Sequence, residues 1–216
     1  MSNVNVFIFF LLGALSFAFI AIRFAASSAT AFRRFSIGLG LLALAFATWS
    51  VIIATHPSDI TTLTTVGVIP FGLANLFFVL SATTIFDSKT RTVLVSVAVA
   101  VLGALFVLRT FITPSKPEIN AGGYFSFNAD PLAMLLYVVV FAGALMPAVQ
   151  VVSTQIKNPK TAMFTRLFFN VVTLSGVVLL VSTNDELQNL NGYVLLAALI
   201  GLVVTHARKA PEALSN

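Results

Sequence analysis

Long apolar runs, separated by short polar stretches, follow one another along the whole chain. Seven runs approach or exceed the 20 or so residues that a helix needs to cross the hydrocarbon core of a bilayer. They cover residues 4–24, 35–55, 63–86, 92–112, 132–155, 164–183 and 190–207. None shows the alternating polarity, in segments of about ten residues, that is typical of a membrane β-barrel. Because a backbone in lipid must satisfy its own hydrogen bonds, each run predicts a transmembrane α-helix.

The polar stretches between these runs are short, apart from one that extends from Thr113 to Pro131. None is long enough for a separate soluble domain, and no internal repeat is evident. We therefore expect an all-α integral membrane protein in which residues 1–216 form a single seven-helix domain. The sequence Ala29-Thr30-Ala31 resembles a signal-peptidase site. No basic residue precedes the first run, however, so we expect that run to be retained as a helix.

The composition agrees with a membrane protein. Of the 216 residues, 58% are hydrophobic and 9% are charged, whereas soluble domains carry roughly 25% charged residues. The formal net charge is +5, which in a soluble protein could indicate nucleic-acid binding. Here the basic residues lie at the ends of the predicted helices, where they contact anionic lipid. We therefore expect membrane lipids among the partners, and no nucleic acid.

The lysines and arginines lie almost entirely on one side of the predicted membrane. The other side holds Arg109 and Lys116. The first side holds ten basic residues: Arg23, Arg33, Arg34, Lys89, Arg91, Lys157, Lys160, Arg166, Arg208 and Lys209. Since basic residues accumulate on the cytoplasmic side, we expect the N-terminus outside and the C-terminus in the cytoplasm. The expected location is a cell membrane, specifically the bacterial cytoplasmic membrane.

The predicted helices lack the chemistry of pumps, pigments and metalloenzymes. No Asp, Glu or Lys lies in the middle of a run, and Lys209 follows the last run, where it cannot form a retinal Schiff base. His56 and His206 lie at opposite rims of the membrane and cannot share a haem or a metal ion. Cysteine is absent. We expect no cofactor, with retinal and haem both excluded, no metal site and no catalytic residue.

The fifth and sixth runs carry the most polar residues, near their predicted cytoplasmic ends. Gln150 and Thr154 share a helix face with Pro147, which should kink the helix, and Asn170 and Thr173 share a face of the next helix. An amide in hydrocarbon needs a hydrogen-bond partner on a neighbouring helix. We therefore expect Gln150 and Asn170 to point into the bundle and bond each other or the two threonines. The cluster is either a ligand site or a helix-packing contact.

The third run contains a second group of candidate residues. Proline and glycine interrupt it at Gly67, Pro70 and Gly72, and Asn75 lies on the same helix face as Gly67. A weakened helix with a central amide can line a cavity, with Gly67, Pro70 and Asn75 as its lining. The alternative is a kinked helix in close packing.

One segment resembles a known family. It reads GLGLLALAFATWSVIIATHPSDITTLTTVGVIPFGLANLFFVLSATTIF, with Trp49 near the outer end of its first helix and a short Ser-Asp turn after it. This resembles the seven-helix N-terminal sensor regions of some bacterial histidine kinases. The resemblance covers these two helices and implies a role in sensing or signalling. In that family a cytoplasmic output domain follows the membrane part. Because the last predicted helix here ends at residue 207 of 216, we expect any signal to pass to a separate partner.

We therefore expect a non-enzymatic, sensor-like or accessory seven-helix protein that binds an apolar or lipid-like ligand, a partner membrane protein, or both. The alternative is a small passive carrier or channel-like protein for a neutral solute. A closed interior rich in phenylalanine would favour binding, whereas a water-accessible central cavity would favour passive transport.

The charge bias makes the topology testable with reporter fusions. Fusions after Asp59 and after Glu186 should report the outside, and fusions after Arg91 and after Lys209 should report the cytoplasm. Alkaline phosphatase and green fluorescent protein activities would measure the two locations. A cytoplasmic signal after Glu186 would contradict the seven-helix count.

Overall fold

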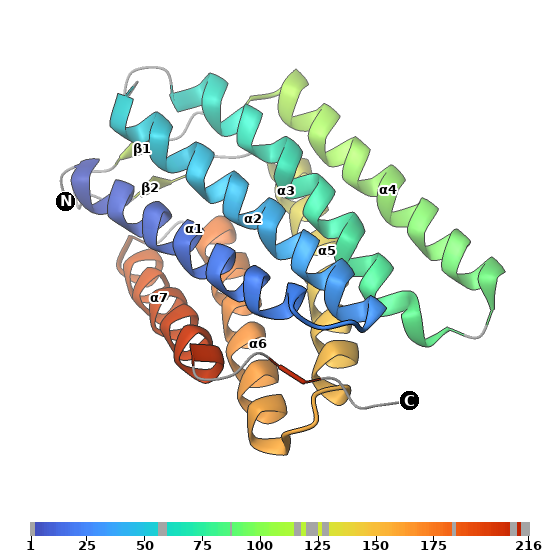
Figure 1. Cartoon of the computed structure of the whole chain (residues 1–216). Helices are drawn as coiled ribbons and strands as arrows, with labels where there is room; N and C mark the ends of the chain where they lie inside the picture. Colours follow the sequence, from blue (N-terminus) through green and yellow to red (C-terminus); the bar gives the residue numbers. More distant parts are fainter. Residues whose placement is uncertain are drawn as a thin grey trace.

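A computed structural model describes residues 3–55, 60–86, 88–114, 118–119, 125–126, 130–182, 185–207 and 211–212. The long helices are α1 (Asn3–Ala25), α2 (Thr30–Thr55), α3 (Ile60–Ala82), α4 (Lys89–Ile112), α5 (Pro131–Thr154), α6 (Pro159–Val181) and α7 (Asp185–Ala207) (Figure 1). Within these described ranges, seven helices are long and apolar enough to cross a membrane. The predicted all-α fold, with seven helices long and apolar enough to span a membrane, is confirmed. The side on which each terminus lies stays a prediction.

Two short elements accompany the long helices. A single 3-10 turn, η1 (Thr83–Ile85), follows α3. Within the long connection between α4 and α5, strands β1 (Glu118–Ile119) and β2 (Phe125–Ser126) pair antiparallel, with Glu118 opposite Ser126. We call the end of the bundle that holds the C-terminus of α7 the inner end, and the opposite end, with β1 and β2, the outer end.

The last two helices begin before the apolar runs that predicted them. α6 begins at Pro159 rather than at residue 164, and α7 begins at Asp185 rather than at residue 190. The Asn158 side chain caps α6 by accepting hydrogen bonds from the backbone N–H groups of Lys160 at 3.0 Å and Thr161 at 3.2 Å. An apolar run marks the part of a helix that lies in lipid, whereas the cap residue determines where the helix begins.

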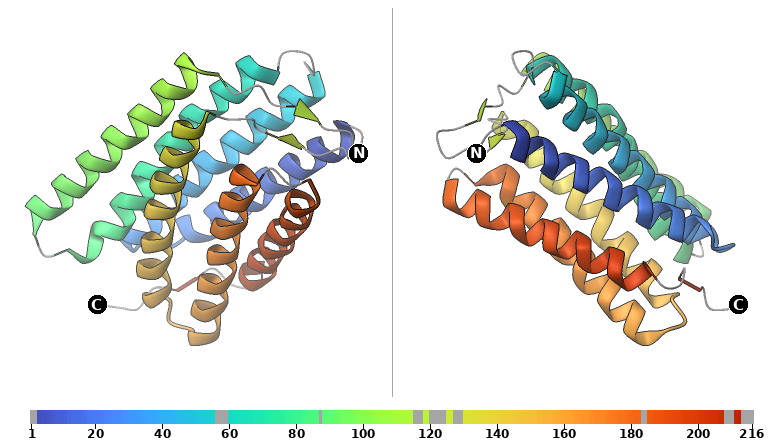
Figure 2. Two further views of the ribbon diagram at one scale, coloured as in Figure 1. Left: turned by 180° about the vertical axis from the view of Figure 1, so that it is seen from behind. Right: turned by 60° about the vertical axis from the view of Figure 1, so that its left-hand side comes forward.

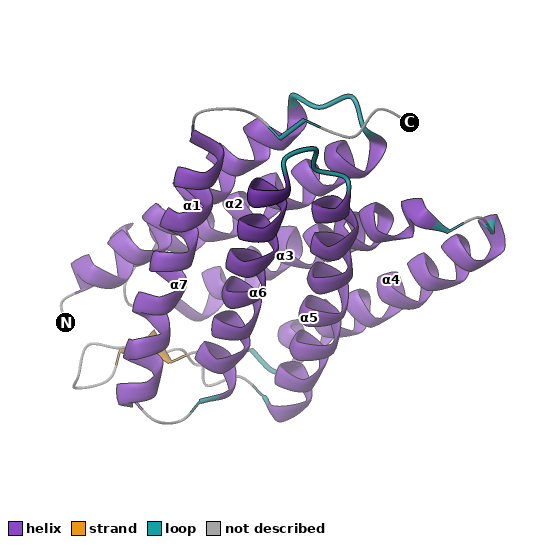
Figure 3. Ribbon diagram, turned by 90° about the horizontal axis from the view of Figure 1, so that it is seen from below, coloured by secondary structure: helices purple, strands orange, loops and turns teal. Residues whose placement is uncertain are grey.

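Six helices close into a ring, and α4 lies outside it. Around the ring, the packed pairs are α1–α2, α2–α3, α3–α5, α5–α6, α6–α7 and α7–α1. α4 packs against α3 and α5, on the side of the bundle away from α1 and α7 (Figure 3). From behind, α4 and α5 are close at their outer ends and diverge toward their inner ends (Figure 2, left). The protein is thus a closed six-helix ring with one peripheral helix.

Phenylalanine rings fill the centre of the ring. The Phe35 ring of α2 lies 5.4 Å from the Phe78 ring of α3 and 5.2 Å from the Phe169 ring of α6, measured between centroids. All three side chains are fully buried. Phe24 of α1 packs edge-on against Phe35 at 5.3 Å. Contacts of this kind add to the hydrophobic stabilisation that their buried area provides, and here they join four of the six ring helices.

Arginines tie neighbouring helices together at the inner end. Arg23 of α1 donates from Nε to the carbonyl of His206 at 2.8 Å and from Nη2 to that of Ala207 at 3.2 Å. Arg34 of α2 donates to the carbonyl of Leu80 near the end of α3, at 2.8 Å. The last carbonyls of a helix have no partner within that helix and carry partial negative charge, so a cation is favourable there. Arg23 thereby joins the first helix to the last.

A third arginine tie joins α5 to α6. Arg166 donates from Nε to the Ser153 hydroxyl at 3.1 Å, and Ser153 itself is buried. The long arginine stem lets a charged group bridge two helices near the end of a span.

Two glycines of α2 give a matched test of the packing. A Cβ at Gly38 would lie 2.6 Å from a ring carbon of Phe78 and 3.2 Å from the carbonyl oxygen of Ala74, whereas a Cβ at Gly40 would meet nothing within 4 Å. We expect Gly38→Leu to lower the free energy of unfolding by about 1–3 kcal/mol through overpacking. Gly40→Leu should leave it nearly unchanged. Thermal unfolding in detergent would measure both, and equal losses in the two variants would contradict this α2–α3 packing.

Candidate functional site

The residues of the predicted polar cluster do not come together. On α5, Gln150 and Thr154 are exposed on the surface of the bundle. On α6, Thr173 is fully buried and Asn170 is half-buried. The expectation that both amides point into the bundle is wrong for Gln150. Apart from the face that carries Gln150 and Thr154, α5 is almost entirely apolar, and the sequence does not show whether that face lies inside or outside the bundle.

The hydroxyls of this cluster are satisfied within their own helices. Thr154 donates to the carbonyl of Val151 at 2.8 Å, and Thr173 donates to that of Phe169 at 2.8 Å. The Gln150 and Asn170 side chains make no hydrogen bond to any residue that the structure describes. Arg166 and Ser153 make the polar contact between α5 and α6 in place of the expected amide pair.

The second predicted group lies at the α2–α3 contact. Gly67 allows the Trp49 indole to lie against α3, since a Cβ at residue 67 would be 2.8 Å from the indole Cδ1. Pro70 is half-buried. Asn75 is fully buried and donates from Nδ2 to the carbonyl of Phe71 at 2.9 Å, while its Oδ1 has no partner among the described residues. The space beside Gly67 is therefore filled by the Trp49 side chain.

Aromatic rings surround the α3 position next to Asn75. The Phe71 ring stacks on Tyr137 of α5 at 5.0 Å between centroids. It also contacts Phe141 of α5 at 5.3 Å and Phe106 of α4 at 6.1 Å. The Trp49 ring of α2 lies 6.5 Å away. An aromatic cluster built from four helices thus lies in the region where the sequence predicted a cavity.

His206 forms a buried polar contact that the sequence did not single out. Its Nε2 lies 3.1 Å from the Thr165 hydroxyl of α6, which donates its proton to the carbonyl of Thr161 at 2.7 Å. A hydroxyl has one proton to give, so Thr165 must accept from His206 Nε2–H. His206 therefore carries a proton on Nε2. Its Nδ1 atom is buried without a partner in the described part of the chain.

The sequence gave one weak signal for this contact. His206 lies at the inner end of the last apolar run, and Thr165 lies near the inner end of the run before it. Sequence-adjacent antiparallel helices bring such ends together. The fold also places Phe24 of α1 against the His206 ring, at 5.1 Å between centroids, and no periodicity predicts that contact.

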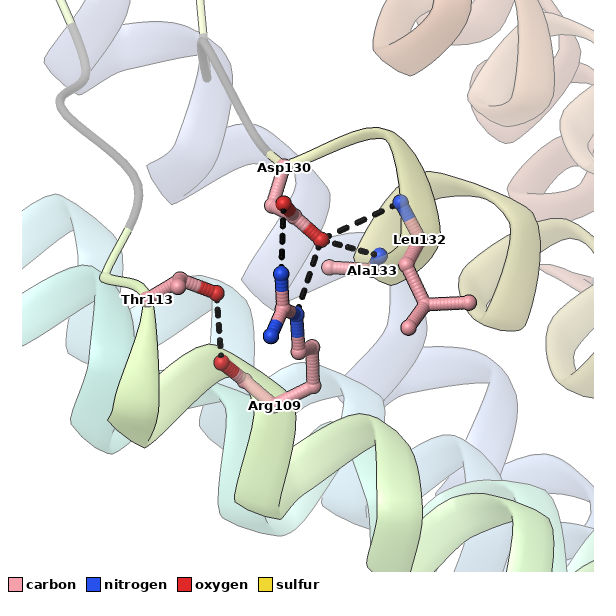
Figure 4. Close-up of polar contacts among 5 residues, drawn as sticks. All are labelled: Arg109, Thr113, Asp130, Leu132 and Ala133. Carbon is pink, nitrogen blue, oxygen red and sulfur yellow. Dashed lines mark hydrogen bonds and ion pairs between the residues drawn. The ribbon is translucent and has the colours of Figure 1, made fainter.

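At the outer end, a bidentate ion pair holds α4 against α5 (Figure 4). Arg109 donates from Nε and Nη2 to the two carboxylate oxygens of Asp130, each at 2.9 Å. Asp130 also caps α5, since its Oδ2 accepts from the backbone N–H of Leu132 at 3.1 Å and of Ala133 at 3.2 Å. The bonds from Arg109 hold the pKa of the Asp130 carboxyl below its usual value of 3.8, and the two backbone N–H groups act in the same direction.

The polar contacts described above join neighbouring helices or cap a helix. Within the described ranges, no group of three or more His, Cys, Asp or Glu side chains lies close enough to hold a metal ion. No family model matches the sequence, and no curated protein or solved structure is significantly similar to it. The resemblance to histidine-kinase sensor regions therefore stays a prediction, as does the binding of a ligand by either predicted group.

The Arg109–Asp130 pair makes stability depend on pH. Because the folded-state pKa of Asp130 lies below the unfolded value of 3.8, the pair stabilises the fold fully above that pH. The contribution disappears as the pH falls through the folded-state pKa. Asp130→Asn keeps a capping side chain but removes the charge. We expect this variant to unfold at a lower temperature at neutral pH, and to lose less stability than the wild type on acidification below pH 3.8.

Arg109→Gln is the matched control for the ion pair and should show the same weakened pH dependence. Thermal unfolding across a pH series in one detergent measures all three proteins. If the wild type and both variants lose stability in parallel on acidification, the pair does not link stability to pH.

Proposed function

We propose that the protein has no catalytic role and acts by binding another membrane protein, with α4 as its main contact surface. The observation that carries this proposal is the burial of the spanning helices. Only 6% of the most apolar window of α4 is buried within the protein, against 28–50% for the other six helices. α4 packs against the bundle along one face, with Val99 and Val107 against the core, and presents the rest of its surface to its surroundings.

The position of α4 supports the same proposal. The six-helix ring is closed without α4, whose buried residues, Gly103, Phe106 and Thr110, all lie in its outer half. Its inner half leans away from α5 (Figure 2) and carries exposed aliphatic side chains: Val93, Leu94, Val95, Val97 and Val101. A partner helix can pack against this half from more than one side. Small and branched side chains permit the close approach on which helix association in membranes depends.

The interior of the bundle supports binding on the outside over passive transport. Rings from α1, α2, α3 and α6 meet across the centre of the helix ring, and a second aromatic cluster joins α2, α3, α4 and α5. A neutral solute would have to displace these buried rings to cross. An apolar ligand would also find its most accessible surface on α4, so lipid is the natural competitor of the partner protein there.

Site-specific photocrosslinking in native membranes tests the proposal. A photoreactive amino acid at Val97 or Val101 of α4 should give a discrete adduct with one protein. The same residue at Ile22 of α1 or Ile200 of α7 should not. The four positions are comparably exposed, at 53–69% of the side-chain maximum, so exposure alone would label them equally. A bulky Ala100→Trp substitution beside the probes should abolish a specific adduct.

Two outcomes would contradict a protein partner on α4. The first is equal labelling at all four positions. The second is labelling at Val97 and Val101 that yields lipid adducts alone, which would favour a lipid-like ligand instead. The thermal stability of each variant shows whether loss of an adduct reflects loss of the fold.

A further inference from the structure

One face of α5 presents polar groups to the surrounding membrane. Gly143, Pro147, Gln150 and Thr154 follow one another at the spacing of a single helix face, and all four are exposed. We call these four residues the α5 ridge. A Cβ at Gly143 would meet nothing within 4 Å. The ridge is therefore an uncovered surface at which another backbone could approach α5 closely.

Two groups on the ridge lack a usual hydrogen-bond partner within α5 or from the described residues around it. Pro147 has no N–H to give to the carbonyl of Gly143, four residues earlier. Gly143 lies about midway along α5 (Pro131–Thr154), far from either end where water could replace that bond. The Gln150 amide, one turn before the end of α5, has no partner among the described residues. The Thr154 hydroxyl of the ridge differs, since it donates within its own helix, to the carbonyl of Val151 at 2.8 Å.

We propose that the α5 ridge is a self-association surface, which pairs with the same ridge of a second copy of this chain. Lipid tails can neither donate to the Gly143 carbonyl nor bond the Gln150 amide. A second protein surface can do both while covering the gap at Gly143.

The common orientation of all copies in the membrane favours a second copy of the chain as the partner at the α5 ridge. Two copies of one chain insert with the same orientation, so a two-fold axis along the membrane normal brings each residue opposite its counterpart at the same depth. The Gln150 amide carries both a donor and an acceptor and can exchange two hydrogen bonds with its counterpart. A lysine or a carboxylate at this position would instead repel its own copy. The ridge holds no charged residue.

Gly143 fits the same arrangement. Without a Cβ, two copies of α5 can approach closely near the middle of the span. The Cα–H of one glycine can then reach the carbonyl that Pro147 leaves free in the other copy, a weak bond that recurs at helix–helix interfaces. The ridge and the exposed half of α4 are on different helices, so this association and the binding proposed for α4 use different residues.

The absence of cysteine from the chain makes crosslinking a direct test. Thr154→Cys places one thiol at the inner end of the ridge and removes a hydroxyl that bonds only within α5. A short bismaleimide added to native membranes should convert much of this variant to a covalent dimer. Ile22→Cys in α1 and Val204→Cys in α7 are controls near the same end of the bundle, with exposures of 69% and 68%. They should stay monomeric.

Two further substitutions in the Thr154→Cys background identify the groups responsible. Gln150→Leu removes the amide, and Gly143→Ile fills a space that is open in the monomer. Each should weaken dimer formation roughly three- to tenfold, the range expected for one interhelical hydrogen bond in a membrane. Gln150→Asn, which keeps an amide, should retain more of the dimer than Gln150→Leu. Unchanged thermal unfolding of monomer in detergent shows that each variant still folds.

The proposal is overturned if the two control cysteines crosslink as efficiently as Thr154→Cys, because dimers would then report random collision. It is overturned equally if Thr154→Cys gives no dimer, or if Gln150→Leu leaves the dimer yield unchanged.

Discussion

Hydrocarbon offers no hydrogen bonds, so every polar group of this chain that lies in the membrane must find its partner within protein. Most backbone groups find a partner within their own helix, and arginine side chains supply hydrogen bonds at several helix ends. Arg23, Arg34 and Arg166 each reach from one helix to a polar oxygen on a neighbour, and Arg109 joins the carboxylate that caps α5. The two hydrogen bonds from Arg23 to the end of α7 close the six-helix ring.

The filled interior of the ring contrasts with two exposed surfaces, one on α4 and one on α5. Phenylalanine packing fills the centre of the ring, and both proposed interactions lie on the outer surface. Two parts of that surface stand out for different physical reasons. α4 is exposed because the ring does not need it. The α5 ridge is exposed although it carries an amide and a carbonyl that lipid cannot satisfy. The first surface suits an apolar partner helix, and the second suits a surface with matching polar groups.

The sequence predicted the seven helices because span length and apolar composition are local properties. It placed the starts of α6 and α7 too late, because caps such as Asn158 lie outside the apolar run. Periodicity correctly placed Gln150 and Thr154 on one face of α5. It could not orient that face, since apolar side chains cover the rest of α5 and suit both lipid and the bundle interior. The contacts of Gly67 with Trp49 and of Thr165 with His206 depend on how helices are arranged in space, which no single segment encodes.

Closure of the ring between its first and last helices has a consequence for biosynthesis. The carbonyl that Arg23 binds belongs to a residue 183 positions later in the chain. At roughly 5–20 residues per second, the ribosome needs about 10–40 s to make that residue after Arg23. Throughout this interval α1 is in the membrane without one of its two neighbours. The ring therefore cannot close until α7 has been made, whereas α1 can pack against α2 well before that.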